Sequence, residues 1–152
     1  TGDRFEGGAG NDVMIGVTYT EVNGQTQFIG HGLLIGGAGA DTLLGDYLDD
    51  WMLSEDALDT FATPGFGNDL WQLTGSMSVA WNGQWGNDTL VAADGGATFA
   101  GETGDDVLVG GAGADSFLGG ANNDLFVEIG GGADTVDGGG GGDTVADGPG
   151  ST

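Results

Sequence analysis

Aspartate residues recur at regular intervals along the second half of the chain. They are Asp88, Asp106, Asp115, Asp124, Asp134 and Asp143. The last five follow one another at steps of 9, 9, 10 and 9 residues. Ala97 occupies the position, nine residues after Asp88, at which the series would have another aspartate. A carboxylate is a hard oxygen ligand, and a hard cation such as Ca²⁺ takes six to eight oxygens. The spacing therefore predicts a series of similar cation sites.

Glycine-rich turns precede these aspartates, and a large apolar residue follows two positions after each. The turns read GGAGAD at 110–115 and GGGGGD at 138–143, and the same unit occurs upstream at 7–12 and 36–41. Glycine allows tight turns with φ > 0 and brings bare backbone close to an ion. The apolar residues are Met14, Leu43, Trp71, Leu90, Phe99, Leu108, Phe117, Phe126, Val136 and Val145. Each unit is thus predicted to form a turn and a short strand, with two units per coil and parallel pairing between coils.

The composition excludes several classes of partner. The 152 residues include 36 glycines and two prolines without a three-residue period, so the chain is not collagen-like. Arg4 is the single base among 24 acids, giving a formal charge of −23. Nucleic acid is excluded because binding it requires Lys and Arg, and no stretch is long enough for membrane insertion. With no cysteine, a metal ion is the expected staple.

The repeated unit matches G-G-x-G-x-D-x-U-x, in which U is large and apolar, over residues 1–15, 36–44 and 83–146. The chain therefore resembles the RTX (repeats-in-toxin) haemolysin-type calcium-binding repeat family. The resemblance implies an all-β, right-handed parallel β-roll, or β-solenoid, that binds several Ca²⁺ ions. It also implies export by a type I secretion system and folding on extracellular calcium, as a structural module of a larger secreted or cell-surface protein.

The same resemblance implies which atoms hold calcium. Ions would lie between turns two repeats apart, pairing Asp88 with Asp106, Asp106 with Asp124 and Asp124 with Asp143 on one edge, and Asp115 with Asp134 on the other. The implied carboxylate ligands are Asp12, Asp41, Asp69, Asp88, Asp106, Asp115, Asp124, Asp134 and Asp143. The implied backbone ligands are Gly8, Gly10, Gly37, Gly39, Gly86, Gly101, Thr103, Gly104, Gly111, Gly113, Gly119, Gly120, Ala121, Asn122, Gly131, Gly138 and Gly140. Because Ala97 cannot ligate, a site between it and Asp115 is expected to be weak or empty.

A single domain over 1–152 is predicted, with two interruptions. Repeats occupy 1–15 and 36–45, degenerate repeats occupy 46–82, and regular repeats occupy 83–146. Between the first two lies a predicted hairpin at 16–35, in which Asn23-Gly24 is flanked by VTYTEV and QTQFIG. Asp50 and Asp59 lie on the nine-residue ladder but lack a glycine turn, so no calcium site is predicted there, and a short helix or irregular loop over 54–60 fits equally well. Because the chain begins and ends inside repeats, we expect a fragment of a longer protein.

No catalytic group stands out. His31 is the single histidine, and no serine lies in a nucleophile elbow. The pair Asp105/Asp106 could suggest a two-carboxylate glycosidase, but the repeat already explains Asp106 as a metal ligand. We therefore expect a non-enzyme.

Four tryptophans, Trp51, Trp71, Trp81 and Trp85, lie in the irregular middle. They are interpreted as core or edge-covering residues, since Trp71 holds an apolar repeat position. The alternative is a glycan-binding or adhesive surface. Two other roles stay open: a segment of an RTX adhesin, or the non-catalytic part of a secreted protease, lipase or epimerase.

Overall fold

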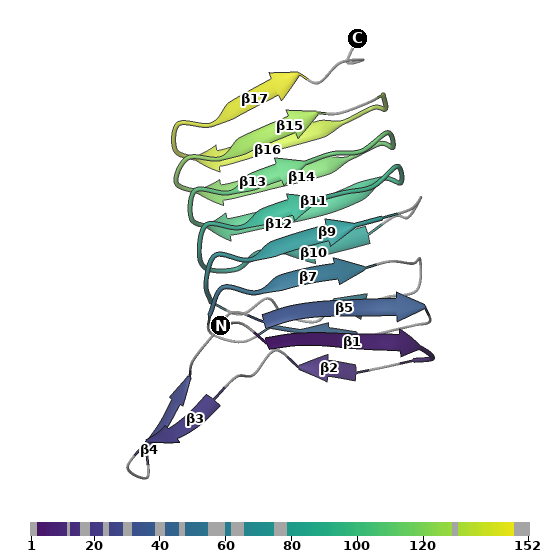
Figure 1. The fold of residues 1–152 in the computed structure, drawn as a ribbon. Helices are drawn as coiled ribbons and strands as arrows, with labels where there is room; N and C mark the ends of the chain where they lie inside the picture. Colours follow the sequence, from purple (N-terminus) through teal and green to yellow (C-terminus); the bar gives the residue numbers. More distant parts are fainter. Residues whose placement is uncertain are drawn as a thin grey trace.

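Short strands joined by tight turns stack into two walls in the computed structural model of the chain (Figure 1). The structure describes residues 3–11, 13–15, 19–22, 25–28, 32–38, 42–45, 48–54, 60–61, 66–74, 79–128 and 131–147. Every regular element among them is a β-strand, and none is a helix long and apolar enough to cross a membrane. The predicted fold class, an all-β parallel β-roll with an inserted hairpin, is confirmed.

The first wall is an eight-stranded parallel sheet. Its strands, in spatial order, are β1 (Asp3–Ala9), β5 (Gly32–Ala38), β7 (Trp51–Ser54), β9 (Leu70–Leu73), β11 (Thr89–Val91), β13 (Val107–Val109), β15 (Leu125–Glu128) and β17 (Thr144–Asp147). Neighbouring strands follow each other after one coil, so that Leu90 pairs with Leu108 and Leu108 with Phe126.

The second wall consists of two smaller parallel sheets. One contains β10 (Val79–Asn82), β12 (Ala97–Thr103), β14 (Ser116–Ala121) and β16 (Thr135–Gly140), and the other contains β2 (Val13–Ile15), β6 (Thr42–Leu44) and β8 (Thr60–Phe61). An antiparallel pair, β3 (Tyr19–Val22) and β4 (Gln25–Phe28), lies outside the stack (Figure 1). It flanks Asn23-Gly24, as predicted for the hairpin.

The apolar repeat residues fill the narrow space between the walls. Leu34, Leu43, Leu90, Leu108 and Phe126 are completely buried. Aromatic rings continue the core from coil to coil: Trp71, Trp81, Phe99, Phe117 and Phe126 stand in one row with successive centroids 5.1, 5.2, 5.7 and 6.2 Å apart. Phe5 and Val145 are exposed because β1 and β17 each have a neighbouring strand on one side only.

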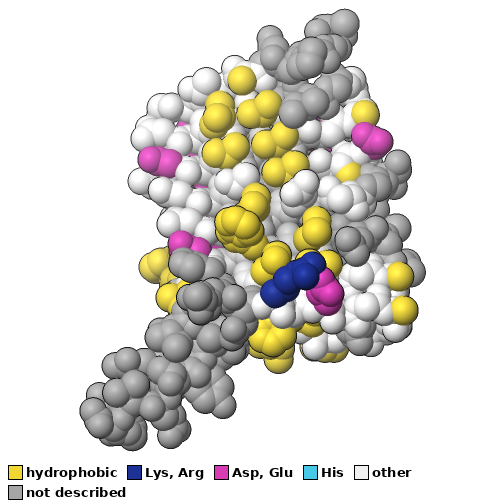
Figure 2. Space-filling model, in the orientation of Figure 1, with side chains coloured by type: hydrophobic (Ala, Val, Ile, Leu, Met, Phe, Trp, Pro, Cys, Tyr) yellow, Lys and Arg dark blue, Asp and Glu magenta, His cyan; other side chains and the backbone are white. Residues whose placement is uncertain are grey.

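The outer face of the eight-stranded sheet is largely apolar (Figure 2). Its side chains include Leu33, Ile35, Trp51, Leu53, Leu70, Val91, Val107, Val109, Leu125 and Val127. Adjacent strands lie about 4.8 Å apart, so these side chains cover one another and all except Trp51 are only partly exposed. This lateral packing stabilises the wall in addition to the core.

The four tryptophans divide into two pairs. Trp71 and Trp81 are in the core, as interpreted from the sequence. For Trp51 and Trp85 the core interpretation is wrong: their side chains are 55% and 61% exposed. Trp51 lies beside Met52, which takes the inward position on β7, and Trp85 lies in the turn that follows β10. The short helix or loop considered over 54–60 falls mostly outside the described residues, although Ser54 and Thr60 lie in strands.

Candidate metal centre

One column of aspartates runs along the edge where turns enter the eight-stranded sheet. Its members are Asp50, Asp69, Asp88, Asp106, Asp124 and Asp143, of which all but Asp143 are buried. Each backbone N–H donates to Oδ1 of the next aspartate: Asp50 to Asp69 at 2.7 Å, Asp69 to Asp88 and Asp88 to Asp106 at 2.8 Å, and Asp106 to Asp124 and Asp124 to Asp143 at 3.0 Å. The sequence-predicted pairs therefore lie next to one another on this edge.

The second carboxylate oxygen of four of these aspartates lacks a partner. Within the described part of the chain, Oδ2 of Asp69, Asp88, Asp106 and Asp124 is buried and accepts no hydrogen bond. A buried, unpaired carboxylate oxygen is costly, because the protein supplies nothing in place of the lost water. A row of such oxygens, all facing the same way from turn to turn, indicates a missing positive partner.

Glycines lie directly against these oxygens. A methyl group at Gly83 would lie 2.9 Å from the carbonyl oxygen of Gly101 and closer still to Oδ2 of Asp88. The same arrangement recurs one coil on, where Oδ2 of Asp106 and the carbonyl of Gly119 both lie close to Gly101. It recurs again at Gly119, which faces Asp124 and the carbonyl of Gly138. In each such cradle, one carboxylate oxygen and one carbonyl oxygen lie together against a glycine, where any side chain would displace them.

The electrostatics of the column oppose ionisation without a cation. Burial raises the pKa of Asp69 to about 8, helped by the charge of Asp88 and partly offset by the N–H of Asp50. Burial likewise raises the pKa of Asp88 to about 7 and that of Asp106 to about 6, with the next carboxylate along the column adding to each. The pKa of Asp124 is raised for the same reasons. A divalent cation among these oxygens would relieve both the desolvation and the repulsion.

These donors fit calcium. All of them are oxygens, which suits a hard cation, and soft sulfur ligands do not occur because the chain has no cysteine. Among the described residues, no three acidic or histidine side chains converge on one point. A site must therefore combine carboxylates of adjacent coils with backbone carbonyls, as the cradles provide.

The opposite edge is built differently. The N–H of Ala97 donates to Oδ1 of Asp115 at 2.7 Å, and the N–H of Asp115 donates to Oδ1 of Asp134 at 2.8 Å. Oδ2 of Asp115 accepts the N–H of Gly111 at 3.0 Å, so it is not orphaned like its counterparts on the first edge. Burial is the main cause that raises the pKa of Asp115. Asp134 is exposed.

A second ladder, not anticipated from the sequence, runs beside the first. It uses the residue before each aspartate. The N–H of Asn68, Asn87, Asp105, Asn123 and Gly142 donates to the side-chain oxygen of Asp49, Asn68, Asn87, Asp105 and Asn123, respectively, at 2.7–2.9 Å. The signal was present in the sequence as a run of Asn or Asp before the repeat aspartates. This second ladder of hydrogen bonds holds the turns at a fixed spacing.

The structure adds Asp50 to the candidate ligands. No calcium site was predicted at this position because its turn lacks the glycine pattern. Nevertheless Asp50 is completely buried, its Oδ1 accepts the N–H of Gly32 at 3.2 Å, and Met52 fills the core position two residues later. The sequence did contain a signal for Asp50: it lies on the nine-residue ladder of aspartates, and an apolar residue follows two positions later.

The other sequence-predicted ligands lie in the turns as follows. The carbonyls of Thr103, Ala121 and Gly140 accept the N–H of Gly86, Gly104 and Asn122 from the preceding coil, at 2.9, 3.3 and 2.8 Å. Gly8 pairs with Gly37 in β1 and β5, both with positive φ. The remaining described positions, Gly10, Gly111, Gly113, Gly120 and Gly131, also lie in or beside turns. Asp12, Gly39, Asp41 and His31 lie outside the described residues.

A parallel β-roll with a buried aspartate and a glycine cradle in successive turns defines a calcium-binding repeat protein. The chain belongs to the RTX calcium-binding nonapeptide repeat family, whose model matches it four times, over residues 2–16, 29–54, 91–126 and 130–146, more than half of the sequence. The second match includes Asp50. Comparison with curated proteins and with solved structures gave no match.

Proposed function

We propose that this chain is a non-catalytic structural module of a larger secreted protein, and that it folds when it meets extracellular calcium. The observation that carries the proposal is the row of buried Oδ2 atoms without partners at Asp69, Asp88, Asp106 and Asp124. A stable fold would not retain four such atoms in register unless a ligand compensated them.

Charge explains why folding would wait for calcium. Without cations, the folded roll holds a column of buried carboxylates in a chain of net charge −23, while the core is only one side chain deep per strand. Bound ions stabilise the folded state alone, each by about 1.4 kcal/mol at ten times its dissociation constant. Several sites together therefore supply a large part of an ordinary domain stability of about 5–15 kcal/mol.

Three ligand sets are best supported. They pair Asp88 with the carbonyl of Gly101, Asp106 with that of Gly119, and Asp124 with that of Gly138. Weak sites of this kind would stay empty in the cytosol and fill outside the cell, which favours passage of an unfolded chain through a type I secretion system. The rest of the parent polypeptide would then be the module's other partner, at the cell surface or in the medium.

Calorimetric titration with calcium tests the proposal. The chain is expected to bind several ions with heat that includes folding, and magnesium at the same concentration is expected to fail, because it prefers tight octahedral geometry with retained water. Gly101→Ala would displace the oxygens of one cradle and should lower the number of bound ions. The matched control is Gly140→Ala, which keeps the backbone carbonyl of that residue and whose methyl group meets one atom, at 4.0 Å, so no oxygen is displaced. Equal ion counts for both variants would contradict the proposed ligand sets.

A further inference from the structure

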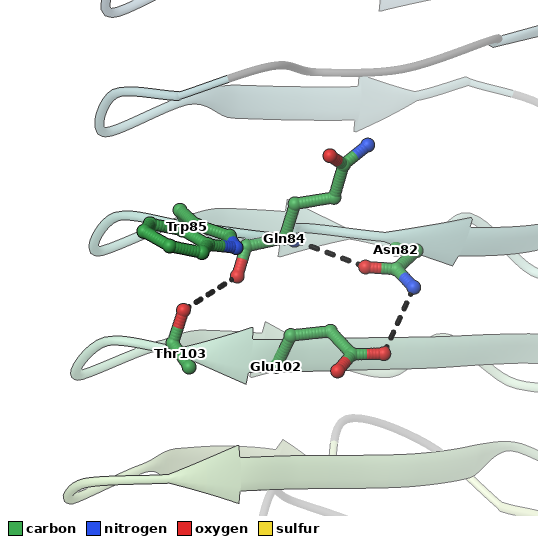
Figure 3. Close-up of a pocket in the computed structure, with 5 residues that line it drawn as sticks. All are labelled: Asn82, Gln84, Trp85, Glu102 and Thr103. Atoms are coloured by element: carbon green, nitrogen blue, oxygen red, sulfur yellow. Dashed lines mark hydrogen bonds between the residues drawn. The ribbon is translucent and has the colours of Figure 1, made fainter.

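A shallow dent lies on the second wall, beside the turn that follows β10. It encloses about 130 Å³ and is lined by Asn82, Gln84, Trp85, Glu102 and Thr103 (Figure 3). None of these side chains takes part in the aspartate column. The repeat pattern has glycine at the positions of Gln84 and Glu102 and leaves those of Trp85 and Thr103 open, so it does not account for these side chains.

The indole of Trp85 is largely exposed, and the residues in register with it become smaller from coil to coil. Phe66 pairs with Trp85 on one side, with ring centroids 5.1 Å apart and planes at 70°. On the other side the same position is Thr103, then Ala121, then Gly140. One side of the indole is therefore packed against an aromatic neighbour, while the side towards Thr103 stays accessible.

The backbone beside the indole carries long polar side chains where later coils have glycine. Gln84 and Glu102 have φ of 73° and 76°, and the positions that follow Glu102 in register are Gly120 and Gly139, with φ of 113° and 82°. A left-handed conformation costs free energy for a residue other than glycine, and such strain tends to be retained at functional positions. Among the described residues, the other non-glycine residue with positive φ is Asn122, a residue type that tolerates this conformation, so Gln84 and Glu102 bear the larger cost.

Hydrogen bonds fix the polar groups of the dent in one arrangement. The Asn82 side-chain amide donates to Oε1 of Glu102 at 3.0 Å, and its Oδ1 accepts the N–H of Gln84 at 3.0 Å. The hydroxyl of Thr103 donates to the carbonyl of Gln84 at 2.9 Å. Among the described residues, Oε2 of Glu102 accepts no hydrogen bond. Figure 3 shows the carboxylate and the amide directed towards each other, along the strands from the indole.

We propose that Trp85 and Glu102, positioned by Asn82, bind an alkylammonium or guanidinium group, carried by a small organic cation or by a Lys or Arg side chain of a partner. An indole face attracts such a cation, and the Glu102 carboxylate, which lines the same dent, adds to the attraction, so the two together suit a group that is both apolar and positive. Because 24 acids face one base, the chain stays negatively charged with several calcium ions bound and concentrates cations at its surface. A bare metal ion would gain no binding free energy from the indole, and an uncharged sugar would gain none from the negative charge of the chain.

Titration of the calcium-loaded chain tests this site. The probe signal is the indole N–H resonance of Trp85 in a ¹H–¹⁵N spectrum, assigned with Trp85→Phe. Choline chloride and arginine amide are expected to shift it in a saturable manner at millimolar concentration. The uncharged shape analogue of choline, 3,3-dimethylbutan-1-ol, and methyl glucoside are expected not to. A response to either neutral compound equal to that to choline would overturn the proposal.

Substitutions at Glu102 separate binding from fold. Glu102→Gln keeps the shape and is expected to weaken choline binding by about five-fold, whereas the control Asp94→Asn, an equal charge change at an exposed site in another turn, is expected to weaken it less than two-fold. Glu102→Gly relieves the strained backbone, so its melting temperature in calcium is expected to rise while binding is lost. Unchanged affinity in Glu102→Gln, or a lower melting temperature in Glu102→Gly, would show that Glu102 serves the fold instead.

Discussion

At the scale of single residues, each aspartate of the column uses its two oxygens differently. Oδ1 of Asp106 accepts the N–H of Asp88, which joins two coils, while Oδ2 faces the cradle of Gly101 without a protein partner. The first task needs only an acceptor, and the second needs a negative charge. An Asn side chain can therefore replace Asp as the hydrogen-bond acceptor, but it cannot supply the negative charge.

Asp106→Asn is expected to lower the free energy of unfolding in saturating calcium by about 1–3 kcal/mol, because the hydrogen bond to Asp88 survives but an NH₂ group faces the ion. Asp105→Asn is the matched control. It makes the same charge change one residue away, at an exposed acceptor for Asn123, and should cost less than about 0.5 kcal/mol. Denaturant unfolding with excess calcium measures both. Equal losses would show that the column acts through its hydrogen bonds alone.

The raised pKa values predict an inverted pH dependence for the calcium-free chain. The pKa of Asp69 is about 8 and that of Asp88 about 7 in the folded state, against an ordinary value of 3.8. Between about pH 4 and pH 8 the folded chain therefore binds more protons than the unfolded chain, so its free energy of unfolding falls as the pH rises through this range.

Acidification from about pH 8 to pH 5 should accordingly increase the β-sheet signal of a chain freed of calcium on a chelating resin. The pH is kept above the isoelectric point of 4.1 to avoid precipitation. The variant Asp69→Asn, Asp88→Asn lacks the two groups and should show a flatter profile in circular dichroism. A signal that decreases on acidification would refute the assigned ionisation.

Much of this residue-level picture could be predicted from spacing. Asp88, Asp106 and Asp124 stand in one column because a coil of 18 residues returns each of them to the same edge. Asp50 could not be assigned, because its turn is built without the glycine pattern and only tertiary stacking shows that its carboxylate is buried. The Asn and Asp ladder was also missed, because a polar residue in a turn has many possible partners until register is known.

At the scale of the turn and strand, the residues at the first and sixth positions are matched in five turns, although Asp69, preceded by Pro64, departs from this pattern. Gly83, Gly101, Gly110, Gly119 and Gly138 each precede an aspartate by five residues, and at each of them a methyl group would collide with Oδ2 of that aspartate. In the turn that lacks an aspartate, Ala97 at the sixth position is accompanied by Ala92 at the first. A methyl group thus stands at the first position in the turn where no carboxylate at the sixth position would collide with it.

This matching predicts how the missing aspartate can be restored. Ala97→Asp alone should destabilise the roll by about 1–3 kcal/mol, because its new carboxylate would meet the methyl group of Ala92. Combined with Ala92→Gly, the same substitution should add one bound calcium ion in a calorimetric titration. Ala92→Gly with Ala97→Asn is the control and should add none. A new ion in the Ala97→Asp single variant would disprove the steric part of the argument.

At the scale of the whole molecule, the chain is a one-dimensional stack in which each coil contacts only its neighbours. The nine-residue period and the inward apolar positions predicted stacked parallel coils, and the resemblance to the RTX repeat family supplied the β-roll. The exposed position of Trp51 could have been predicted from the register, because Met52 beside it takes the inward position; that of Trp85, which lies in a turn, could not. The strain at Gln84 and Glu102 was likewise invisible without backbone angles.

Repulsion among the carboxylates destabilises the whole stack, and we expect calcium binding to remove it. Far-ultraviolet circular dichroism of the chain at neutral pH, first with chelator and then with millimolar calcium, tests this central claim most directly. The account predicts a largely unfolded spectrum in chelator that changes cooperatively to a β-sheet spectrum when calcium is returned, with no change on adding magnesium. A β-sheet spectrum that persists unchanged in chelator would contradict it.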